Sequence, residues 1–359
     1  MRWYSAASNG WPATANSRNR KLPDPDTDTD TDVDVDTDVD VLTGALARAL
    51  SRHLPQDAAG CRIVAGFSGG RDSVALLAGL QALQPRWGYR LSACHVHHGL
   101  SPQADDWQAF CQDYCQRLGV ALTVCRVCVP ADSPEGLEAA ARRVRYEAFT
   151  ALEADWLALA HHQGDLAETW LFNLLRGAGL AGLRGMPQVR PLRPGLNLIR
   201  PLLQVRRHDI EAYLAARGEA WVEDESNAET RFARNFLRRQ VLPLLHQRFP
   251  AVQERLAVTA AHIEEAQGLL DELALVDLAG NVPRFPLPLA VLAGLSEPRG
   301  RNVLRFLLAQ QGVMIPAEAR LKEALRQLLA ARPDRHPAVS LGTHVLVRVR
   351  CEVRLEKTG

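Results

Sequence analysis

Six consecutive residues carry the clearest chemical signal in the chain: Ser68-Gly69-Gly70-Arg71-Asp72-Ser73. This run follows a short apolar stretch and leads directly into a helical pattern. The glycines let the backbone turn tightly and present its N–H groups, and the new helix adds unpaired N–H groups and the positive end of its dipole. We therefore predict an anion cradle in which the two serine hydroxyls donate hydrogen bonds.

The run differs from both common phosphate loops. No lysine follows the glycines as in GxxxxGKS/T, and the glycine spacing is not GxGxxG. Asp72 would be a carboxylate facing a polyphosphate, and two such anions repel each other unless a Mg²⁺ ion lies between them. The sequence thus predicts a polyphosphate site in which Asp72 holds the metal.

Two acidic residues stand three apart at the start of a later helical pattern. Asp165 and Glu168 share one helix face there, and together they are suited to hold a cationic amine. Ordinary negative charge at a helix N terminus is the alternative. His161 and His162 precede them, and no cysteine or carboxylate completes a zinc set at suitable spacing. We expect these histidines to hydrogen-bond a phosphate or a nucleobase.

A third group of polar residues is the arginine run Arg142, Arg143 and Arg145 on a predicted helix. A spacing of three places Arg142 and Arg145 on one side of that helix. Solvent exposure without a role is the alternative for at least one of them.

Alternating strands and helices must position these residues. Apolar runs at 61–67, 91–96, 122–129 and 156–160 predict strands, and the stretches 73–84, 104–118, 136–153 and 165–176 predict helices. This alternation is typical of βαβ units around a parallel sheet. We predict a doubly wound α/β domain over residues 41–245, whose ligands bind at the carboxyl ends of the strands.

The remaining residues predict a second, smaller body. A Gly/Pro-rich connector covers 177–201, and helices are expected near 206–217 and 231–247 and over about 251–278. We predict a helical linker over 246–282 and a small α+β domain over 283–359. That domain is expected to contain helices near 299–310 and 317–331 and one strand that ends the chain.

The predicted last strand alternates apolar and charged residues. Arg348, Arg350 and Arg354 fall on one of its faces, opposite Val347, Val349, Cys351, Val353 and Leu355. We expect the three arginines to line an exposed surface, either as charges that protect an edge strand or as a row of RNA contacts.

The first 40 residues differ from the rest in composition. The repeat DPDTDTDTDVDVDTDVD has the period of a strand but too little apolar surface to fold, so we predict a disordered acidic tail over 1–40. The glycine and closing glutamate of a helix-loop-helix calcium site are missing, which argues against calcium. A true start of the reading frame further downstream is an alternative.

Composition and charge narrow the class of protein. The 359 residues are 47% apolar and 23% charged, as in a soluble globular protein, and no run of about 18 apolar residues or secretory signal occurs. We expect a cytoplasmic protein without a membrane partner and with its seven scattered cysteines reduced. Residues 41–359 hold 38 basic and 32 acidic side chains, and almost all the basic ones are arginine, the side chain suited to phosphate contacts.

The SGGxDS pattern after the first strand resembles the signature loop of the PP-loop ATP pyrophosphatases. Members of that superfamily split ATP into AMP and pyrophosphate while adenylating a substrate. The resemblance implies that ATP binds at Ser68, Gly69, Gly70, Arg71, Asp72 and Ser73, with Mg²⁺ on Asp72.

Further stretches resemble one family of this superfamily, the tRNA(Ile)-lysidine synthases. They are 95–101 (HVHHGLS), 140–146 (AARRVRY), 160–169 (AHHQGDLAET), 174–177 (LLRG), 182–187 (GLRGMP), 200–203 (RPLL), 221–227 (WVEDESN), and 231–235 (RFARN) with Arg238. The resemblance covers about residues 45–245 strongly and 283–355 weakly.

This resemblance implies a two-step reaction. O2 of the wobble cytidine in the CAU anticodon of isoleucine tRNA attacks the α-phosphate of ATP, and the ε-amine of free L-lysine then displaces AMP at C2 to give lysidine. Asp165 and Glu168 would hold the lysine, while Arg142 and His161 would stabilise phosphate charge as catalytic residues beside Asp72. Longer members of the family suggest a homodimer.

The chain departs from the family pattern at two positions. His97 stands where asparagine is common, and Gly164 stands where a second acidic residue is common. Many members also carry a further carboxy-terminal domain that contacts tRNA.

Three other functions remain as alternatives. A tRNA thiolation enzyme of the same superfamily would use Cys125 and Cys128, but these fall in a predicted strand on opposite faces. The others are a non-catalytic RNA-binding relative and an amidotransferase-type synthetase. The sequence contains no recognisable glutaminase half, which the amidotransferase-type synthetase would need.

Overall fold

The computed structural model describes residues 37–55, 58–130, 132–133, 136–223, 233–332 and 335–358. The side chains of residues 37–40 are not described. Most of the predicted acidic tail, with its calcium alternative, therefore lies outside the described residues, as does the stretch 224–232. Within the described ranges, none of the helices combines the length and the apolar character that crossing a membrane requires.

The larger domain is built on a six-stranded sheet in the order β3-β2-β1-β4-β6-β5. The strands are β1 (Arg62–Gly66), β2 (Arg90–His97), β3 (Ala121–Arg126), β4 (Trp156–Ala158), β5 (Val189–Arg193) and β6 (Leu196–Ile199). All neighbouring pairs are parallel except β5 with β6. The predicted doubly wound α/β sheet is thus confirmed, with an antiparallel strand at one edge.

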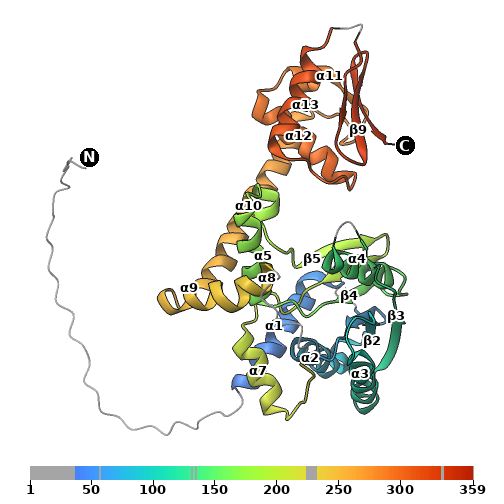
Figure 1. Ribbon diagram of the computed structural model, residues 1–359, viewed down its shortest axis with the longest axis vertical. Helices are drawn as coiled ribbons and strands as arrows, with labels where there is room; N and C mark the ends of the chain where they lie inside the picture. Colours follow the sequence, from blue (N-terminus) through green and yellow to red (C-terminus); the bar gives the residue numbers. More distant parts are fainter. Residues whose placement is uncertain are drawn as a thin grey trace, which may run out of the picture. The chain divides into compact units, whose positions relative to one another are not determined.

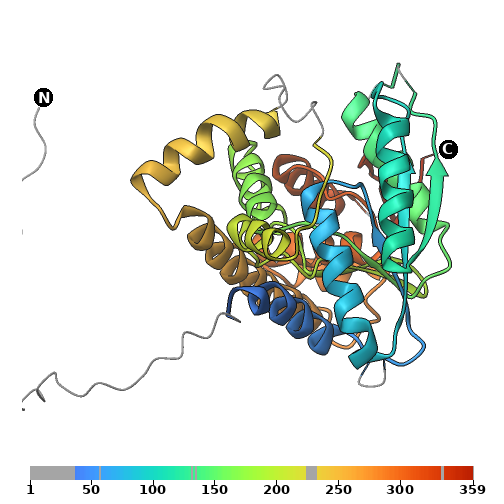
Figure 2. The ribbon, with the colours of Figure 1, turned by 90° about the horizontal axis from the view of Figure 1, so that it is seen from below.

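Helices cover both faces of this sheet (Figures 1 and 2). They are α1 (Thr37–His53), α2 (Arg71–Trp87), α3 (Ala104–Leu118), α4 (Leu137–Thr150), α5 (Gln163–Leu175), α6 (Leu180–Leu183) and α7 (Arg207–Ala216). Strand β1 alternates its side chains between two cores: Ile63 and Ala65 pack with α1, α2 and α7, and Val64 packs with Phe149 of α4. Burial of β1 on both faces explains its continuous apolar run.

Sequence patterns missed four elements of this domain, among them the short helix α6 in the Gly/Pro-rich stretch. Helix α1 was not predicted, although Leu42, Leu46 and Leu50 repeat every four residues and are fully buried. Strands β5 and β6 lie inside the Gly/Pro-rich stretch that was expected to be a connector. Strand β6 has only four residues, and it is held in the sheet by parallel pairing with β4 rather than by a strong pattern of its own.

The helices after the sheet domain follow the predicted order, with one irregularity. Helix α8 (Ala233–Phe236) runs into a π-helical segment, η2 (Leu237–Val241), and then into α9 (Leu242–Arg248). Single π-helical turns are frequent at functional sites. Helix α10 (Val252–Asp277) contacts α5 and α6 of the sheet domain and α12 of the small domain.

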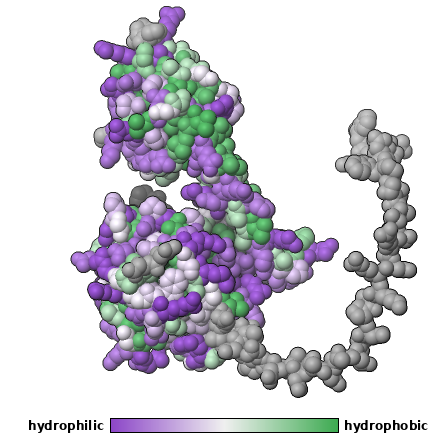
Figure 3. All heavy atoms as spheres, turned by 180° about the vertical axis from the view of Figure 1, so that it is seen from behind, coloured by the Kyte–Doolittle hydropathy of each residue, from purple (hydrophilic) through white to green (hydrophobic). Residues whose placement is uncertain are grey.

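The small domain packs helices on a four-stranded sheet. Its elements are β7 (Leu287–Pro288), α11 (Leu289–Ala293), α12 (Glu297–Gln310), α13 (Glu318–Ala330), β8 (Ala338–Ser340), β9 (His344–Val349) and β10 (Glu352–Lys357), with sheet order β7-β10-β9-β8. The predicted α+β character is confirmed. On the face seen in Figure 3, hydrophobic side chains gather over this domain.

The expected row of three arginines is wrong. The chain reverses at Arg350, whose φ is 55°, so the single predicted strand is the antiparallel hairpin of β9 and β10. Arg348 points inward and is 7% exposed, and it donates hydrogen bonds to Leu328 O (2.9 Å) and Ala331 O (2.7 Å) at the end of α13. The alternation of apolar and charged residues along a strand does not distinguish an exposed arginine from a buried arginine that hydrogen-bonds the last carbonyls of a helix.

The third strand is also shorter than predicted. Strand β3 ends at Arg126, so Cys128 lies beyond it and is exposed, whereas Cys125 lies within it. Both are free thiols.

Candidate active site

The predicted anion cradle forms the turn between β1 and α2. Gly69 has a φ of +82°, a conformation that L side chains rarely adopt. A Cβ there would also lie 3.0 Å from Val222 Cγ2 and 3.1 Å from Cys111 Sγ. The segment around Val222 crosses the turn, because its N–H donates to Gly69 O (3.0 Å). Both the backbone angle and the close packing therefore require glycine at this position.

The two serines hold the turn in shape. Ser73 Oγ donates to Gly70 O at 2.8 Å, and Ser68 Oγ donates to Ser73 Oγ at 3.2 Å. No side chain caps the N terminus of α2, so the cap position is open to an anion, as expected for a phosphate cradle.

Asp72 and Arg71 form an ion-pair chain beside the turn. Arg71 Nε donates to Asp72 Oδ1 (3.0 Å), and Arg71 Nη1 donates to Glu211 Oε1 (2.9 Å) on α7. The Asp72 side chain remains 30% exposed, and its Oδ2 lies 3.7 Å from His162 Nε2. This carboxylate is thus accessible to a ligand.

Helix α5 begins with a capping box. His162 Nδ1 accepts from the N–H of Gly164 (2.9 Å), and Asp165 Oδ2 accepts from the N–H of His162 (3.0 Å). A Cβ at position 164 would lie 2.6 Å from His162 Cε1. With the imidazole in this position, the departure from the family pattern at Gly164 has a steric explanation.

Asp165 and Glu168 converge on a shared cation, which in this structure is the guanidinium of Arg238. Arg238 donates to Glu168 Oε1 (2.6 Å) and Oε2 (2.9 Å) and to Asp165 Oδ1 (3.1 Å). Burial raises the pKa of Glu168 against the opposing effect of Arg238. Burial would also raise the pKa of Asp165, but the two neighbouring histidines and Arg238 hold it below its ordinary value. Two carboxylates share one guanidinium, so one negative charge remains for a second cation.

His161, three residues beyond the end of β4, and Arg145 of α4 face the same cavity. Burial lowers the pKa of His161 to about 3, so its imidazole is neutral at physiological pH. Burial also lowers the pKa of Arg145, although a guanidinium stays charged in proteins. Among the described residues, His161 Nδ1 and Arg145 Nε have no hydrogen-bond partner. Buried polar groups of this kind are expected to meet a ligand or water.

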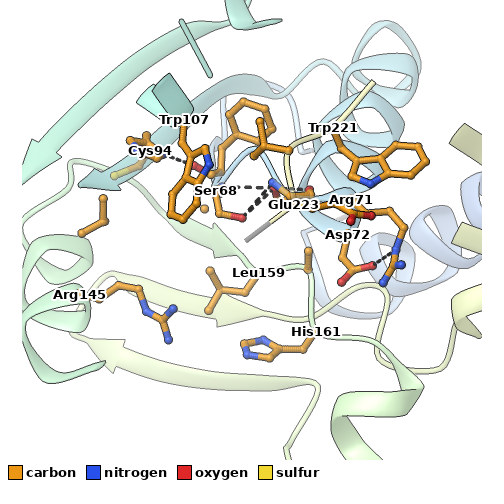
Figure 4. Close-up of a pocket in the computed structure, with 18 of the residues that line it drawn as sticks. Ser68, Arg71, Asp72, Cys94, Trp107, Arg145, Leu159, His161, Trp221 and Glu223 are labelled. Atoms are coloured by element: carbon orange, nitrogen blue, oxygen red, sulfur yellow. Dashed lines mark hydrogen bonds and ion pairs between the residues drawn. The ribbon is translucent and has the colours of Figure 1, made fainter. Parts of the chain in front are cut away.

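Ser68, Asp72, Arg145 and His161 line one cavity of about 810 Å³ at the carboxyl ends of β1, β2 and β4. Figure 4 shows Ser68 on one side of it and Arg145 and His161 on the other. Arg207, Arg238 and Arg239 add positive charge to the wall. A cavity at this edge of the sheet, with a phosphate cradle and several arginines, is suited to a nucleoside polyphosphate.

The structure brings most of the predicted site residues together, with two differences. The cavity wall includes Arg145 and not Arg142, which lies one turn away with its guanidinium 5.1 Å from the Tyr146 ring. Arg238, rather than Asp165 or Glu168, lines the cavity.

Residues from other elements join the wall without a strong sequence signal. Trp107 and Trp221 line it from α3 and from the segment beside the turn, and Arg207 lines it from α7. Trp221 and Arg238 fall in stretches that resemble the family, whereas Trp107 and Arg207 lie outside those stretches. His97, the other departure from the family pattern, is absent from the wall and lies 3.2 Å from Asp105 Oδ1.

The described residues contain no group of three or more His, Cys, Asp or Glu side chains arranged to hold a metal ion. A Mg²⁺ ion that reaches a site with its nucleotide needs only one or two carboxylates beside the phosphates. Asp72, accessible at the cradle, meets that requirement.

The phosphate cradle, the sheet order and the cavity define a nucleotide-binding domain of the PP-loop class. Residues 44–245 match the family described as the PP-loop domain, and residues 287–353 match the TilS substrate binding domain.

Curated relatives narrow this class to one family. The chain is 47% identical over 297 residues to the tRNA(Ile)-lysidine synthase of Aromatoleum aromaticum and 48% identical over 272 residues to that of Azoarcus sp.. These matches cover 82% and 75% of this chain and 69% and 60% of the relatives. The chain belongs to the tRNA(Ile)-lysidine synthase family, and it matches about two thirds of the length of these relatives.

A solved structure shares the fold. The U34-tRNA thiolase NcsA from Methanococcus maripaludis, with its 4Fe-4S cluster, superimposes with a TM-score of 0.52 at 14% identity, over 64% of this chain and 79% of that one. This likeness concerns the fold alone.

Proposed function

We propose that the protein uses ATP to join free lysine to C2 of the wobble cytidine of isoleucine tRNA with a CAU anticodon. The products are lysidine in the tRNA, AMP and pyrophosphate. The observation that carries this proposal is the intact SGGRDS turn on a cationic cavity, in a chain whose curated relatives are tRNA(Ile)-lysidine synthases. The substrates place the reaction in the cytoplasm.

The turn from Ser68 to Ser73 binds the phosphates of ATP in this proposal. Backbone N–H groups at Gly69, Gly70 and the start of α2 donate to phosphate oxygens, with the serine hydroxyls beside them. Asp72 would hold a Mg²⁺ ion, which neutralises phosphate charge when bound. The accessibility of the Asp72 carboxylate supports this assignment.

In the first step, O2 of the cytidine attacks the α-phosphorus, and the bond from that phosphorus to the bridging oxygen of pyrophosphate breaks. Negative charge then develops on the leaving pyrophosphate and around the α-phosphorus. Arg145 and His161 stabilise this charge, because both line the cavity and neither has a hydrogen-bond partner for its buried nitrogen. Arg145 thus takes the role that the sequence analysis gave to Arg142.

In the second step, the lysine ε-amine attacks C2, the C2–O2 bond breaks, and AMP leaves. Asp165 and Glu168 orient the lysine through the negative charge that Arg238 leaves unbalanced. Arg238 lies between these two carboxylates and the cavity. Lysine must therefore either displace the Arg238 side chain or bind those oxygen atoms of Asp165 and Glu168 that are exposed.

The small domain and a second copy of the chain complete the proposed assembly. The match of residues 287–353 to a substrate binding domain supports tRNA binding by the region 283–359. We also retain the homodimer as the proposed oligomeric state. Residues 41–245 act as the catalytic domain and 246–282 as a helical linker in this scheme.

An Asp72→Ala variant tests the division of roles. We expect loss of tRNA-dependent AMP formation from ATP, measured by chromatography, while the affinity for isoleucine tRNA in a filter-binding assay stays unchanged. Asp113→Ala is the control, because Asp113 is an exposed carboxylate on α3 that pairs with Arg117. Equal loss of AMP formation and tRNA binding in Asp72→Ala would contradict the assignment.

A further inference from the structure

Two aromatic rings near the cavity are each flanked by two arginines. The Tyr146 stack consists of Arg142 (5.1 Å from its guanidinium carbon to the ring centre), Tyr146 and Arg190 (5.0 Å). It joins α4 to the edge strand β5. Burial would raise the pKa of Tyr146, but the positive charges of Arg142, Arg190 and the buried Arg200 lower it. The ring therefore lies in a strongly positive field.

The second ring belongs to helix α5. The Phe172 stack consists of Arg176 (5.1 Å from the ring centre), Phe172 and Arg234 (5.7 Å). Arg176 follows directly after α5, and Arg234 comes from α8. Residues far apart in the sequence thus form a second arginine pair around an aromatic ring.

Arg145 of the cavity wall lies within electrostatic reach of both stacks. After burial, the charge of Arg142 is the largest influence that lowers the pKa of Arg145, and Arg234 lowers it as well. One arginine of each stack, Arg142 and Arg234, therefore lies within electrostatic range of the cavity wall.

None of the four stacking arginines forms an ion pair with a carboxylate among the residues that the structure describes. Most other arginines of this domain behave differently: Arg62, Arg117, Arg126, Arg143, Arg206, Arg207 and Arg238 all pair with Asp or Glu. Stacking fixes each guanidinium plane but leaves its charge and its N–H donors available. Fixed cations of this kind favour a polyanion as the partner.

We propose that the two stacks clamp the RNA backbone on either side of the reacting nucleotide. Arg142 and Arg190 would contact phosphates on one side of the flipped wobble cytidine, and Arg176 and Arg234 those on the other. This rests on the proposed function, which requires a nucleotide of the anticodon loop to leave its stack and enter the cavity. Backbone contacts that hold the flanking nucleotides offset the cost of flipping.

The test is binding of an isoleucine tRNA anticodon stem-loop, measured by fluorescence anisotropy over about 50 to 200 mM salt. Each of Arg142→Ala, Arg190→Ala, Arg176→Ala and Arg234→Ala is expected to weaken binding about 3- to 10-fold and to reduce the salt slope by about 0.7. ATP affinity should not change. The matched control is Arg143→Ala, since Arg143 lies beside Arg142 on α4 but pairs with Glu147. It should alter neither quantity.

A double-mutant cycle that combines protein variants with modified RNA tests which phosphates each stack contacts. Neutral methylphosphonate links replace the phosphates on the 5′ or the 3′ side of the wobble nucleotide. The wild-type protein should lose affinity for both, whereas the Arg142→Ala/Arg190→Ala protein should be insensitive to one link and the Arg176→Ala/Arg234→Ala protein to the other. Additive losses, or a salt slope equal to that of wild type in the single variants, would overturn the clamp.

These results are separable from the proposed function. If the wild-type protein transfers lysine but the affinity losses from the arginine variants and the methylphosphonate links are additive, the clamp alone is refuted. A wild-type protein that gives the expected cycles but transfers no lysine supports the clamp and refutes the proposed reaction.

Discussion

Replacing Arg238 with alanine is expected to leave two acidic side chains without their shared cation. Arg238 makes three charged hydrogen bonds, two to Glu168 and one to Asp165. The Glu168 side chain is only 8% exposed, and that of Asp165 is 21% exposed. Glu168 in particular cannot recover by hydration what it loses when the guanidinium is removed.

The magnitude follows from this partial burial. Breaking a fully buried ion pair costs roughly 3 to 5 kcal/mol, and an exposed pair contributes less than about 1 kcal/mol. Because the Arg238 side chain is itself 36% exposed, we place the loss at about 3 kcal/mol in the free energy of unfolding. Urea unfolding followed by circular dichroism measures it.

Two further variants make this prediction specific. Arg239→Ala, on the adjacent exposed residue of the same π-helical segment, should cost less than about 0.5 kcal/mol. Adding Glu168→Gln to Arg238→Ala should restore roughly half of the loss, because it removes the buried charge that lacks a partner. A loss in Arg238→Ala no larger than in Arg239→Ala, or no recovery in the double variant, would refute the reasoning.

Three other changes have expected outcomes. Gly69→Ala should lower the free energy of unfolding by about 2 kcal/mol or more and should also lower ATP affinity. The control Gly60→Ala has a similar φ but open space around it, so it should cost about 1 to 2 kcal/mol of unfolding free energy and leave ATP affinity unchanged. Equal effects of the two substitutions would contradict the packing argument. His161 has a pKa of about 3 in the folded protein and 6.5 in the unfolded chain, so its stabilising contribution is present above pH 6.5 and is lost as pH falls toward 3. In urea unfolding, the wild-type protein should lose stability between pH 7 and pH 5, and His161→Asn should reduce that loss by about 2 kcal/mol. An unchanged loss in the variant would show that the imidazole is not held neutral. Arg348→Met should lower the thermal stability of the small domain by about 2 kcal/mol while Arg354→Ala changes it little, and the reverse order in scanning calorimetry would restore an exposed role to Arg348.

The sequence predicted the sheet domain well where local patterns and tertiary structure agree. The strand before Ser68 is apolar from Ile63 to Ala65 because it is buried there on both faces, and the glycine turn follows because a phosphate cradle needs it. Strand β6 escaped prediction because its four residues depend on pairing with β4, a partner about 40 residues earlier in the chain.

Side-chain direction was harder to predict than element type. Helical spacing places Arg142 and Arg145 on one side, but it does not say which one reaches the cavity, and packing of Tyr146 against Arg142 and Arg190 decides this. Strand alternation failed at Arg348 for a related reason. The turn at Arg350 and the carbonyls at the end of α13 are tertiary features that no local pattern contains.

The carboxylate pair shows a further limit. The spacing of Asp165 and Glu168 predicted a site for a cation, and it could not show that Arg238, 70 residues after Glu168, supplies one. Only the fold brings the π-helical segment next to the start of α5.

Transfer of labelled lysine to tRNA is the direct assay of the proposed reaction. An isoleucine tRNA transcript with a CAU anticodon is incubated with the protein, ATP, Mg²⁺ and labelled lysine, beside the methionine tRNA that shares this anticodon. We expect label in the isoleucine tRNA alone, with one AMP formed for each lysine transferred. RNA-dependent AMP formation without label in the tRNA would contradict it, because the adenylation site would then serve a different nucleophile.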